Sequence, residues 1–154
     1  MKIFGFFILP LLILAFASGC GDKTCTEDSR SIEQYITDNN LTVSEGMQGL
    51  KYIILEEGGV ERPSPTATVI VNYTGTLTND EVFDGTPASG QAPIRFGLNN
   101  LIRGWQLGIP LVGRGGRVQL FIPSALGYGS AGSPPTICPD TDLVFEIELV
   151  NFIE

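Results

Sequence analysis

The residues of this chain that could do chemistry are aromatic and apolar side chains set in short glycine-containing motifs. The motifs are VNYTGTL at 71–77, VFDGT at 82–86, NLIRGWQLGI at 100–109, IPSALGYG at 122–129 and DLVFEIELV at 142–150. The sequence contains no histidine and no cysteine pair at close spacing. It therefore argues against a Ser-His-Asp triad, a Cys-His pair and a histidine-ligated metal. We therefore expect a binding pocket lined by apolar and aromatic side chains.

In this order and at these intervals, the motifs resemble those of the FKBP-type peptidyl-prolyl cis-trans isomerases. The resemblance runs from about residue 46 to residue 154. It implies an enzyme that interconverts the cis and trans forms of the peptide bond before proline. It also implies proline-containing polypeptides as clients, macrolides of the FK506 type as inhibitors, and no cofactor.

The resemblance implies a pocket for the proline ring, with Trp105 as its floor. The residues that would form its walls are Tyr73, Phe83, Ile102 and Phe145. Each has a simpler interpretation, because aromatic residues on strand-like segments are ordinarily core, and the tryptophan could be a helix residue that packs on a sheet.

The resemblance also supplies the polar members of the pocket. Asp84 would hold its carboxylate near the twisting carbonyl, and Tyr128 would donate its hydroxyl to the substrate, as would the backbone N–H of Ile102. Leu101 and Ile137 would border the rim. The alternative for Asp84 is that it only caps its own backbone in a turn.

Such a pocket needs no nucleophile. Amide resonance opposes rotation about the bond before proline with a barrier of about 18–20 kcal/mol. Resonance separates charge between oxygen and nitrogen, and twisting the bond abolishes that separation. Because water stabilises the planar form, a dry aromatic pocket favours the twisted form. Each 1.36 kcal/mol of differential stabilisation gives about a tenfold increase in rate.

The sequence departs from the family pattern near the expected rim. Ile94 follows Pro93 where an aromatic residue is common, and Asn99 occupies a usual glycine position. Ser133 and Cys138 replace other common residues in the 127–140 loop. We expect these changes to affect preference among clients and to leave the inner pocket intact.

The elements that position these residues are mostly strands. Alternation of apolar and polar residues predicts strands at 51–56, 67–73, 116–122 and in the last motif. In the last of these, Leu143, Phe145, Ile147 and Leu149 share one face, with Glu146 and Glu148 on the other. This pattern indicates an antiparallel sheet with one solvated face.

Two short helices are expected. One spans 103–111 and is limited by Pro110; the other spans 31–39, with Ile32, Tyr35 and Ile36 on one face and Asp28 or Ser29 as N-cap. We therefore predict an α+β domain, and the resemblance implies a curved antiparallel sheet wrapped around one short helix. The N-terminal helix would be an extension that docks on this domain.

The N-terminus has the features of an export signal. Lys2 precedes an apolar run at 3–16, which is short for a membrane span, and small residues lead to Cys20. This resembles the lipobox of bacterial lipoproteins, although Ala17 stands where leucine is usual; the alternative is a simple secretory signal. We predict a signal peptide at 1–19, a lipid-anchored tether at 20–45 and the isomerase domain at 46–154.

An acylated Cys20 would leave Cys25 and Cys138 as an even pair in an exported protein, where disulfides form and persist. Cys138 stands where the family usually has proline, and a bridge to Cys25 could supply equivalent rigidity. Two independent thiols, or Cys25 pairing between molecules, are the alternatives.

Charge and glycine spacing exclude nucleic acids and nucleotides as partners. The formal net charge is -8 and the nine basic residues are dispersed, whereas phosphate binding needs clustered Lys and Arg. No GxxxxGK or GxGxxG element follows a predicted strand.

Three functions fit the sequence: a lipid-anchored isomerase acting on bacterial envelope proteins, a binding or chaperone module of the same fold with little turnover, and a structural envelope lipoprotein. Retention of Tyr73, Asp84, Trp105 and Tyr128 favours the enzyme.

Overall fold

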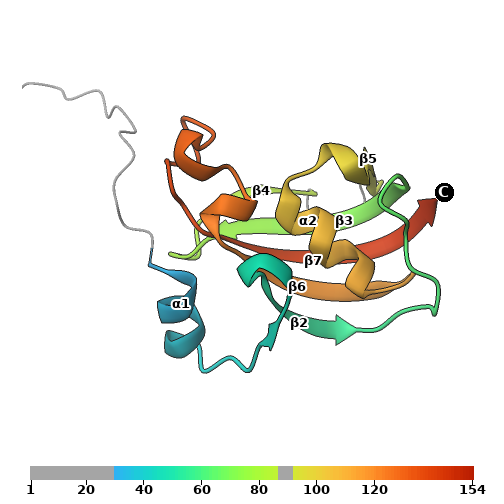
Figure 1. The fold of residues 1–154 in the computed structure, drawn as a ribbon, viewed down its shortest axis with the longest axis horizontal. Coiled ribbons are helices and arrows are strands. Elements are labelled where there is room, and N and C mark those ends of the chain that lie inside the picture. Colours follow the sequence, from blue (N-terminus) through green and yellow to red (C-terminus); the bar gives the residue numbers. More distant parts are fainter. Residues whose placement is uncertain (1–29, 87–91) are drawn as a thin grey trace, which may run out of the picture.

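The computed structural model describes residues 30–86 and 92–154 as a curved antiparallel sheet with two α-helices (Figure 1). The helices are α1 (Ile32–Asp38) and α2 (Arg103–Gly108). The strands are β1 (Ser44–Glu45), β2 (Lys51–Glu56), β3 (Thr68–Leu77), β4 (Val82–Gly85), β5 (Ile94–Gly97), β6 (Gly116–Ile122) and β7 (Leu143–Ile153). The predicted fold class is confirmed.

The sheet has the order β1-β2-β6-β7-β3-β4, and β5 also pairs with β3. Its longest ladder joins β3 to β7, from Thr68 opposite Ile153 to Leu77 opposite Leu143. The other edge of β3 is shared: β5 pairs with residues 68–71 and β4 with residues 74–76. Two short strands therefore follow one another along that edge.

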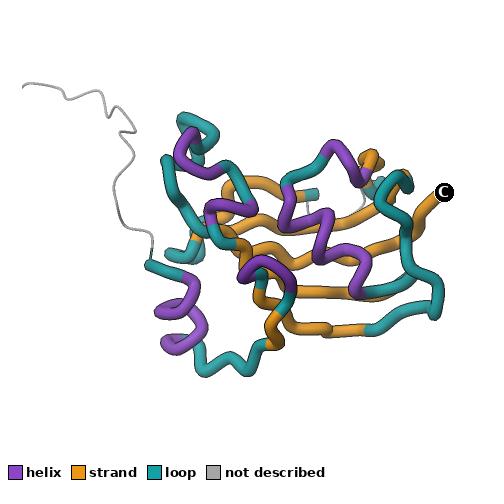
Figure 2. The backbone as a smooth tube through the Cα atoms, viewed as in Figure 1, coloured by secondary structure: helices purple, strands orange, loops and turns teal. Residues whose placement is uncertain are grey.

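The inner face of the sheet packs against α2, which lies across the strands in Figure 2. Gly104 and Gly108 make this approach close. A Cβ at Gly104 would lie 2.6 Å from Ile122, and one at Gly108 would lie 2.4 Å from Leu120. Real Cβ atoms do not approach other atoms so closely, so only glycine allows the helix to lie at this depth.

The outer face is partly covered by α1. Ile32 and Tyr35 are buried against Phe121 of β6 and Val144 of β7, which point away from the inner core. The predicted apolar face of this helix is therefore confirmed. Its N-cap is Ser31, whose Oγ accepts from the N–H of Gln34 at 3.2 Å, so the expectation of Asp28 or Ser29 was wrong.

The sequence located most elements. The predicted strands at 51–56 and 116–122 are β2 and β6, while β3 continues to Leu77. The second helix is α-helical only to Gly108, after which Ile109–Leu111 form a 3-10 turn that contains Pro110. The domain boundaries stay a prediction, and the signal peptide and Cys20 lie outside the described residues.

No helix among residues 30–86 and 92–154 is long and apolar enough to cross a membrane.

Candidate active site

Aromatic rings converge where the inner face of the sheet meets α2. Trp105 is at the centre and is 4% exposed. Its ring centroid lies 5.0 Å from that of Tyr73, 5.2 Å from that of Phe145 and 6.0 Å from that of Phe96. The interplanar angles of 79°, 90° and 88° are edge-to-face arrangements, which aromatic pairs favour.

Phe83 joins this aromatic cluster through Phe145, at 5.4 Å and 87°. Gly75 lies directly beneath the pair, because a Cβ there would be 2.7 Å from both rings. Three members, Tyr73, Phe83 and Phe96, stay only half-buried. The cluster therefore presents apolar surface beside a fully packed core.

A carboxylate borders the cluster. The Tyr73 hydroxyl donates to Asp84 Oδ2 at 2.8 Å, and the N–H of Gly85 donates to Asp84 Oδ1 at 2.8 Å. Asp84 thus caps its own backbone, as the simpler interpretation expected, and also holds the tyrosine. Both oxygens have a fixed donor.

Both nearby tyrosines are neutral at physiological pH. Burial raises the pKa of Tyr73 far above its usual value, and the hydrogen bond to Asp84 and its negative charge add to this effect. Burial also raises the pKa of Tyr128, with a further contribution from the charge of Asp84. Each hydroxyl therefore keeps its proton and can donate it in a hydrogen bond.

The turn before α2 holds Leu101 and Ile102 next to Trp105. The Gln106 side chain donates to the carbonyl of Leu101 at 2.8 Å, which ties the turn to the helix. Ile102 is the N-cap residue of α2, and its backbone N–H has no acceptor among the described residues. Such a group at a helix start is available to a ligand.

The structure brings Tyr73, Phe83, Asp84, Trp105 and Phe145 together. Tyr128 is 39% exposed, close enough to Asp84 to sense its charge, whereas Ile137 is 4% exposed and packs in the main core.

Sequence reasoning missed Phe96 as a member of the cluster. It lies on β5 and packs its ring edge-to-face on Tyr73 and Trp105. The alternation of Ile94, Arg95 and Phe96 was the available signal, since it places Ile94 and Phe96 on one face of a strand.

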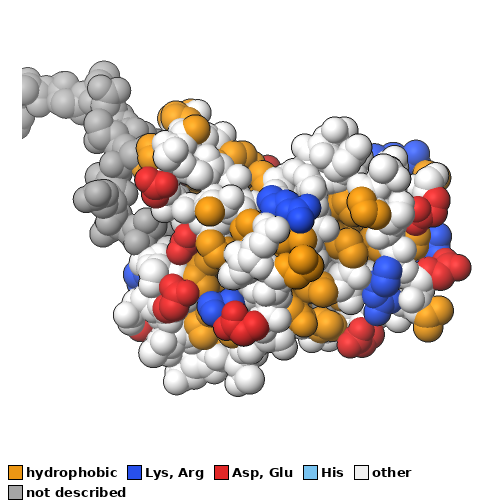
Figure 3. Space-filling view, in the orientation of Figure 1, with side chains coloured by type: hydrophobic (Ala, Val, Ile, Leu, Met, Phe, Trp, Pro, Cys, Tyr) orange, Lys and Arg blue, Asp and Glu red, His pale blue; other side chains and the backbone are white. Residues whose placement is uncertain are grey.

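The described residues contain no group of three or more metal-ligating side chains. Cys138 is disulfide-bonded. Its expected partner Cys25 lies outside the described residues, so that pairing stays a prediction. The face drawn in Figure 3 shows Lys and Arg side chains separated from one another, not gathered into a patch.

Comparison with known proteins identifies the family of this chain. Residues 59–150 match the family of FKBP-type peptidyl-prolyl cis-trans isomerases. The chain belongs to this family. All five aromatic residues of the cluster and Asp84 lie inside the matched segment.

Relatives agree with this assignment. The FKBP-type isomerase FkpA of Escherichia coli K12 is 40% identical over 109 residues, which cover 71% of this chain and 40% of the relative. A probable FKBP-type isomerase of Haemophilus influenzae is 39% identical over 109 residues, covering 71% of this chain and 45% of the relative. The chain thus spans less than half the length of these relatives.

Solved structures share the fold. The crystal structure of FkpA from Escherichia coli superposes with a TM-score of 0.71 at 36% identity, covering 79% of this chain and 57% of that one. A peptidyl-prolyl isomerase of Pseudomonas syringae pv. tomato gives a TM-score of 0.71 at 30% identity, covering 80% and 91% respectively.

Proposed function

We propose that this protein is a peptidyl-prolyl cis-trans isomerase that acts on the bond before proline in unfolded or flexible polypeptides. The observation that carries the proposal is the half-buried aromatic cluster around Trp105, bordered by the Tyr73–Asp84 hydrogen bond. It lies within the segment that matches the isomerase family.

The apolar part of the site would bind the proline ring and exclude water. Trp105 is the proposed floor, and Tyr73, Phe83 and Phe145 are the walls, with Phe96 added from the structure. Removing water from the amide raises the free energy of the planar, charge-separated form relative to that of the twisted form. No bond to the protein forms and no proton is transferred.

The polar groups would orient the substrate. The Tyr128 hydroxyl and the N–H of Ile102 are the proposed donors to carbonyl oxygens on either side of the proline. Asp84 would act at the wall near the twisting carbonyl, held there by its two donors. Hydrogen-bond donors that are already in position need little reorganisation when the bond twists, so little free energy is spent on it.

A protease-coupled assay with a short X-Pro peptide tests this proposal. The protease cleaves only the trans form, so an isomerase shortens the slow phase that the cis form produces. We expect acceleration in proportion to enzyme concentration. Folded protein that gives only the uncatalysed rate would leave the binding or chaperone function as the better interpretation.

We further propose that macrolides of the FK506 type bind over Trp105 and compete with the peptide. The chain has one tryptophan, so its emission reports on this site alone. We expect titration with FK506 to change that emission and to inhibit isomerisation at the same concentration. Inhibition without an emission change would place Trp105 away from the ligand.

The exported location is proposed from the sequence. Cys20 would carry lipid and hold the enzyme at a bacterial envelope membrane, where it would assist folding of exported proteins. Several acyl chains anchor durably, because each buried CH₂ contributes about 0.8 kcal/mol. The change Cys20→Ser should release the protein from the membrane fraction, and retention of this variant would point to an uncleaved helix.

The disulfide between Cys25 and Cys138 is proposed with it. In the chain-entropy model, closing a loop of over a hundred residues contributes up to about 4.7 kcal/mol. Peptide mapping without reductant should yield one fragment that contains both cysteines. A fragment linking Cys138 to any other cysteine would contradict the pairing.

A further inference from the structure

The wall strand β4, which carries Phe83 and Asp84, has little support within the sheet. Among residues 30–86 and 92–154 it pairs with β3 alone, at three residue pairs interrupted by a bulge between Gly75 and Thr76. A strand with one neighbour and a short ladder depends on how its two ends are held.

The end of the strand that leads to Thr86 is held by β3 itself. The N–H of Thr86 donates to the carbonyl of Tyr73 at 2.9 Å, and Thr86 Oγ1 accepts from the N–H of Tyr73 at 2.6 Å. These bonds join the end of β4 to the residue whose hydroxyl contacts Asp84.

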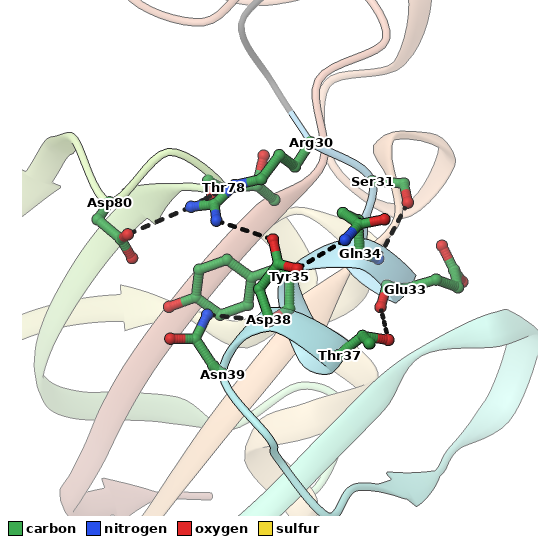
Figure 4. A network of polar contacts seen from close by, with 10 residues as sticks. All are labelled: Arg30, Ser31, Glu33, Gln34, Tyr35, Thr37, Asp38, Asn39, Thr78 and Asp80. Atoms are coloured by element: carbon green, nitrogen blue, oxygen red, sulfur yellow. Dashed lines mark hydrogen bonds and ion pairs between the residues drawn. The ribbon is translucent and has the colours of Figure 1, made fainter.

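The other end is held by an arginine from outside the sheet. Arg30 donates to the carbonyl of Thr78 from Nε at 3.0 Å and from Nη2 at 2.6 Å, and Nη2 also contacts Asp80 Oδ2 at 3.3 Å (Figure 4). Thr78 is fully buried and Asp80 has a positive φ of 70°. The Arg30 guanidinium therefore contacts the turn that leads into β4 at both Thr78 and Asp80.

Arg30 is itself fixed to α1 and the outer face. Its Nη1 lies 3.1 Å from Asp38 Oδ2, and its guanidinium lies 5.6 Å from the centre of the Tyr35 ring. Tyr35 packs on Phe121, with ring centroids 6.2 Å apart. The side chain of Arg30 is therefore held in position by α1, which packs on the outer face of the sheet.

The first turn of α1 also reaches the other side of the site. The N–H of Ile32 donates to Asp142 Oδ2 at 3.1 Å, and Asp142 Oδ1 accepts from the N–H of Ser124 at 2.9 Å. Ser124 begins the 3-10 turn Ser124–Leu126, which leads to Tyr128. Asp142 thus links the start of α1 to the turn that leads to Tyr128, and Arg30 links α1 to the turn that leads into β4.

We infer that α1 is a brace for the active site and that Arg30 is a positioning residue, which sets the place of Phe83 and Asp84 through the turn before β4. The inference rests on the proposed isomerase function for its effect on rate, but its structural part does not. The proline-containing substrate meets β4, and Arg30 acts only through that strand.

The test replaces Arg30 by Met, which keeps an unbranched apolar side chain and removes the guanidinium donors. The matched control is Arg62→Met. The side chains of Arg62 and Arg30 are 34% and 35% exposed, and Arg62 also donates to a backbone carbonyl and a carboxylate, those of Gly59 and Glu57. Its partners lie in the connection between β2 and β3, away from the aromatic cluster.

The activity-independent measurement is amide hydrogen exchange. The N–H of Leu77 bonds to Glu81 and that of Asp80 bonds to Leu77, so both report on this turn. We expect Arg30→Met to speed exchange at both amides about tenfold or more, since local opening governs it, and Arg62→Met to leave them unchanged. Unchanged exchange in Arg30→Met would overturn the proposal.

The measurement of rate uses a double-mutant cycle with Phe83→Leu. We expect Arg30→Met to lower kcat/KM about three- to tenfold, because small displacements of a binding wall weaken productive positioning. The loss should be smaller in the Phe83→Leu background, whereas losses at unconnected sites add. Additive losses would contradict action through β4. Absence of activity in the wild-type protein would instead contradict the proposed function. In that case hydrogen exchange would still test whether Arg30 positions β4.

Discussion

The two faces of the sheet are built from alternate residues of the same strands and serve different purposes. Leu120 and Phe145 point inward to α2, while Phe121 and Val144 point outward to α1. On the outer face, Phe121 is fully buried and Val144 is 3% exposed. On the inner face, the aromatic cluster leaves three rings half-buried.

The difference lies in how each helix approaches. Inside, glycines at 104 and 108 bring α2 close over β6, so the short helix covers only part of the sheet and the aromatic rings extend beyond it. Outside, α1 packs by its large side chains Ile32 and Tyr35 and is fixed at its start by polar bonds. The inner layer therefore leaves aromatic surface accessible beside α2, whereas the outer layer buries its apolar side chains beneath α1.

The part of the outer face that α1 covers should show the largest effect on stability. Phe121→Ala removes the ring on which Tyr35 packs, and we expect a loss of about 3–5 kcal/mol in the free energy of unfolding, as for other buried aromatic residues. Phe121→Leu, as control, keeps most of the apolar volume and should cost clearly less. Urea unfolding measures both. A loss below about 1 kcal/mol for alanine would mean that α1 packs too loosely to act as a brace.

The close approach of α2 comes next in size. Gly108→Ala places a Cβ 2.4 Å from the buried Leu120 side chain, so that side chain or the helix must shift. We expect a cost of about 1–3 kcal/mol, offset in part by the better helix propensity of alanine. Gly59→Ala is the matched control, because its Cβ would meet nothing nearer than 3.7 Å. Equal thermal stability of both variants would show that the depth of α2 is not set by glycine.

At the proposed active site, the charge of Asp84 should affect rate more than stability. Asp84→Asn keeps the shape and weakens the bond from Tyr73. We expect about a tenfold fall in kcat/KM, the equivalent of about 1.4 kcal/mol, with little change in stability because the residue is exposed. Glu81→Gln removes the same charge from the same hairpin and should change neither. Equal effects of the two variants would mean that only net charge matters.

The smallest effect concerns alkaline pH. The pKa of Tyr73 is raised in the folded state, whereas an unfolded tyrosine ionises at about 10. Above that pH the unfolded state loses its proton first, so the free energy of unfolding should fall as pH rises beyond about 10 and stay flat below it. Tyr73→Phe should make the fall less steep in urea unfolding between about pH 8 and 11. Tyr128 and Tyr35, also with raised pKa, would account for the remainder.

Local patterns determined much of this protein from the sequence alone. Alternation along 116–122 and 143–149 assigns each side chain to a face, because successive residues of a strand point to opposite sides. The i, i+3, i+4 spacing of Ile32, Tyr35 and Ile36 identified the buried face of α1 for the corresponding reason in a helix. The motifs that carry Tyr73, Phe83, Trp105 and Phe145 were enough to identify the family.

Only the tertiary structure decided what those faces meet. Arg30 bonds to Thr78 across 48 positions of the chain, and Ile32 bonds to Asp142 across 110. No period in the sequence encodes such pairs, because they depend on how the sheet curves and where the helix comes to rest. Phe96 joined the cluster for the same reason: β5 and β4 share one edge of β3, a placement that pairing decides and spacing does not.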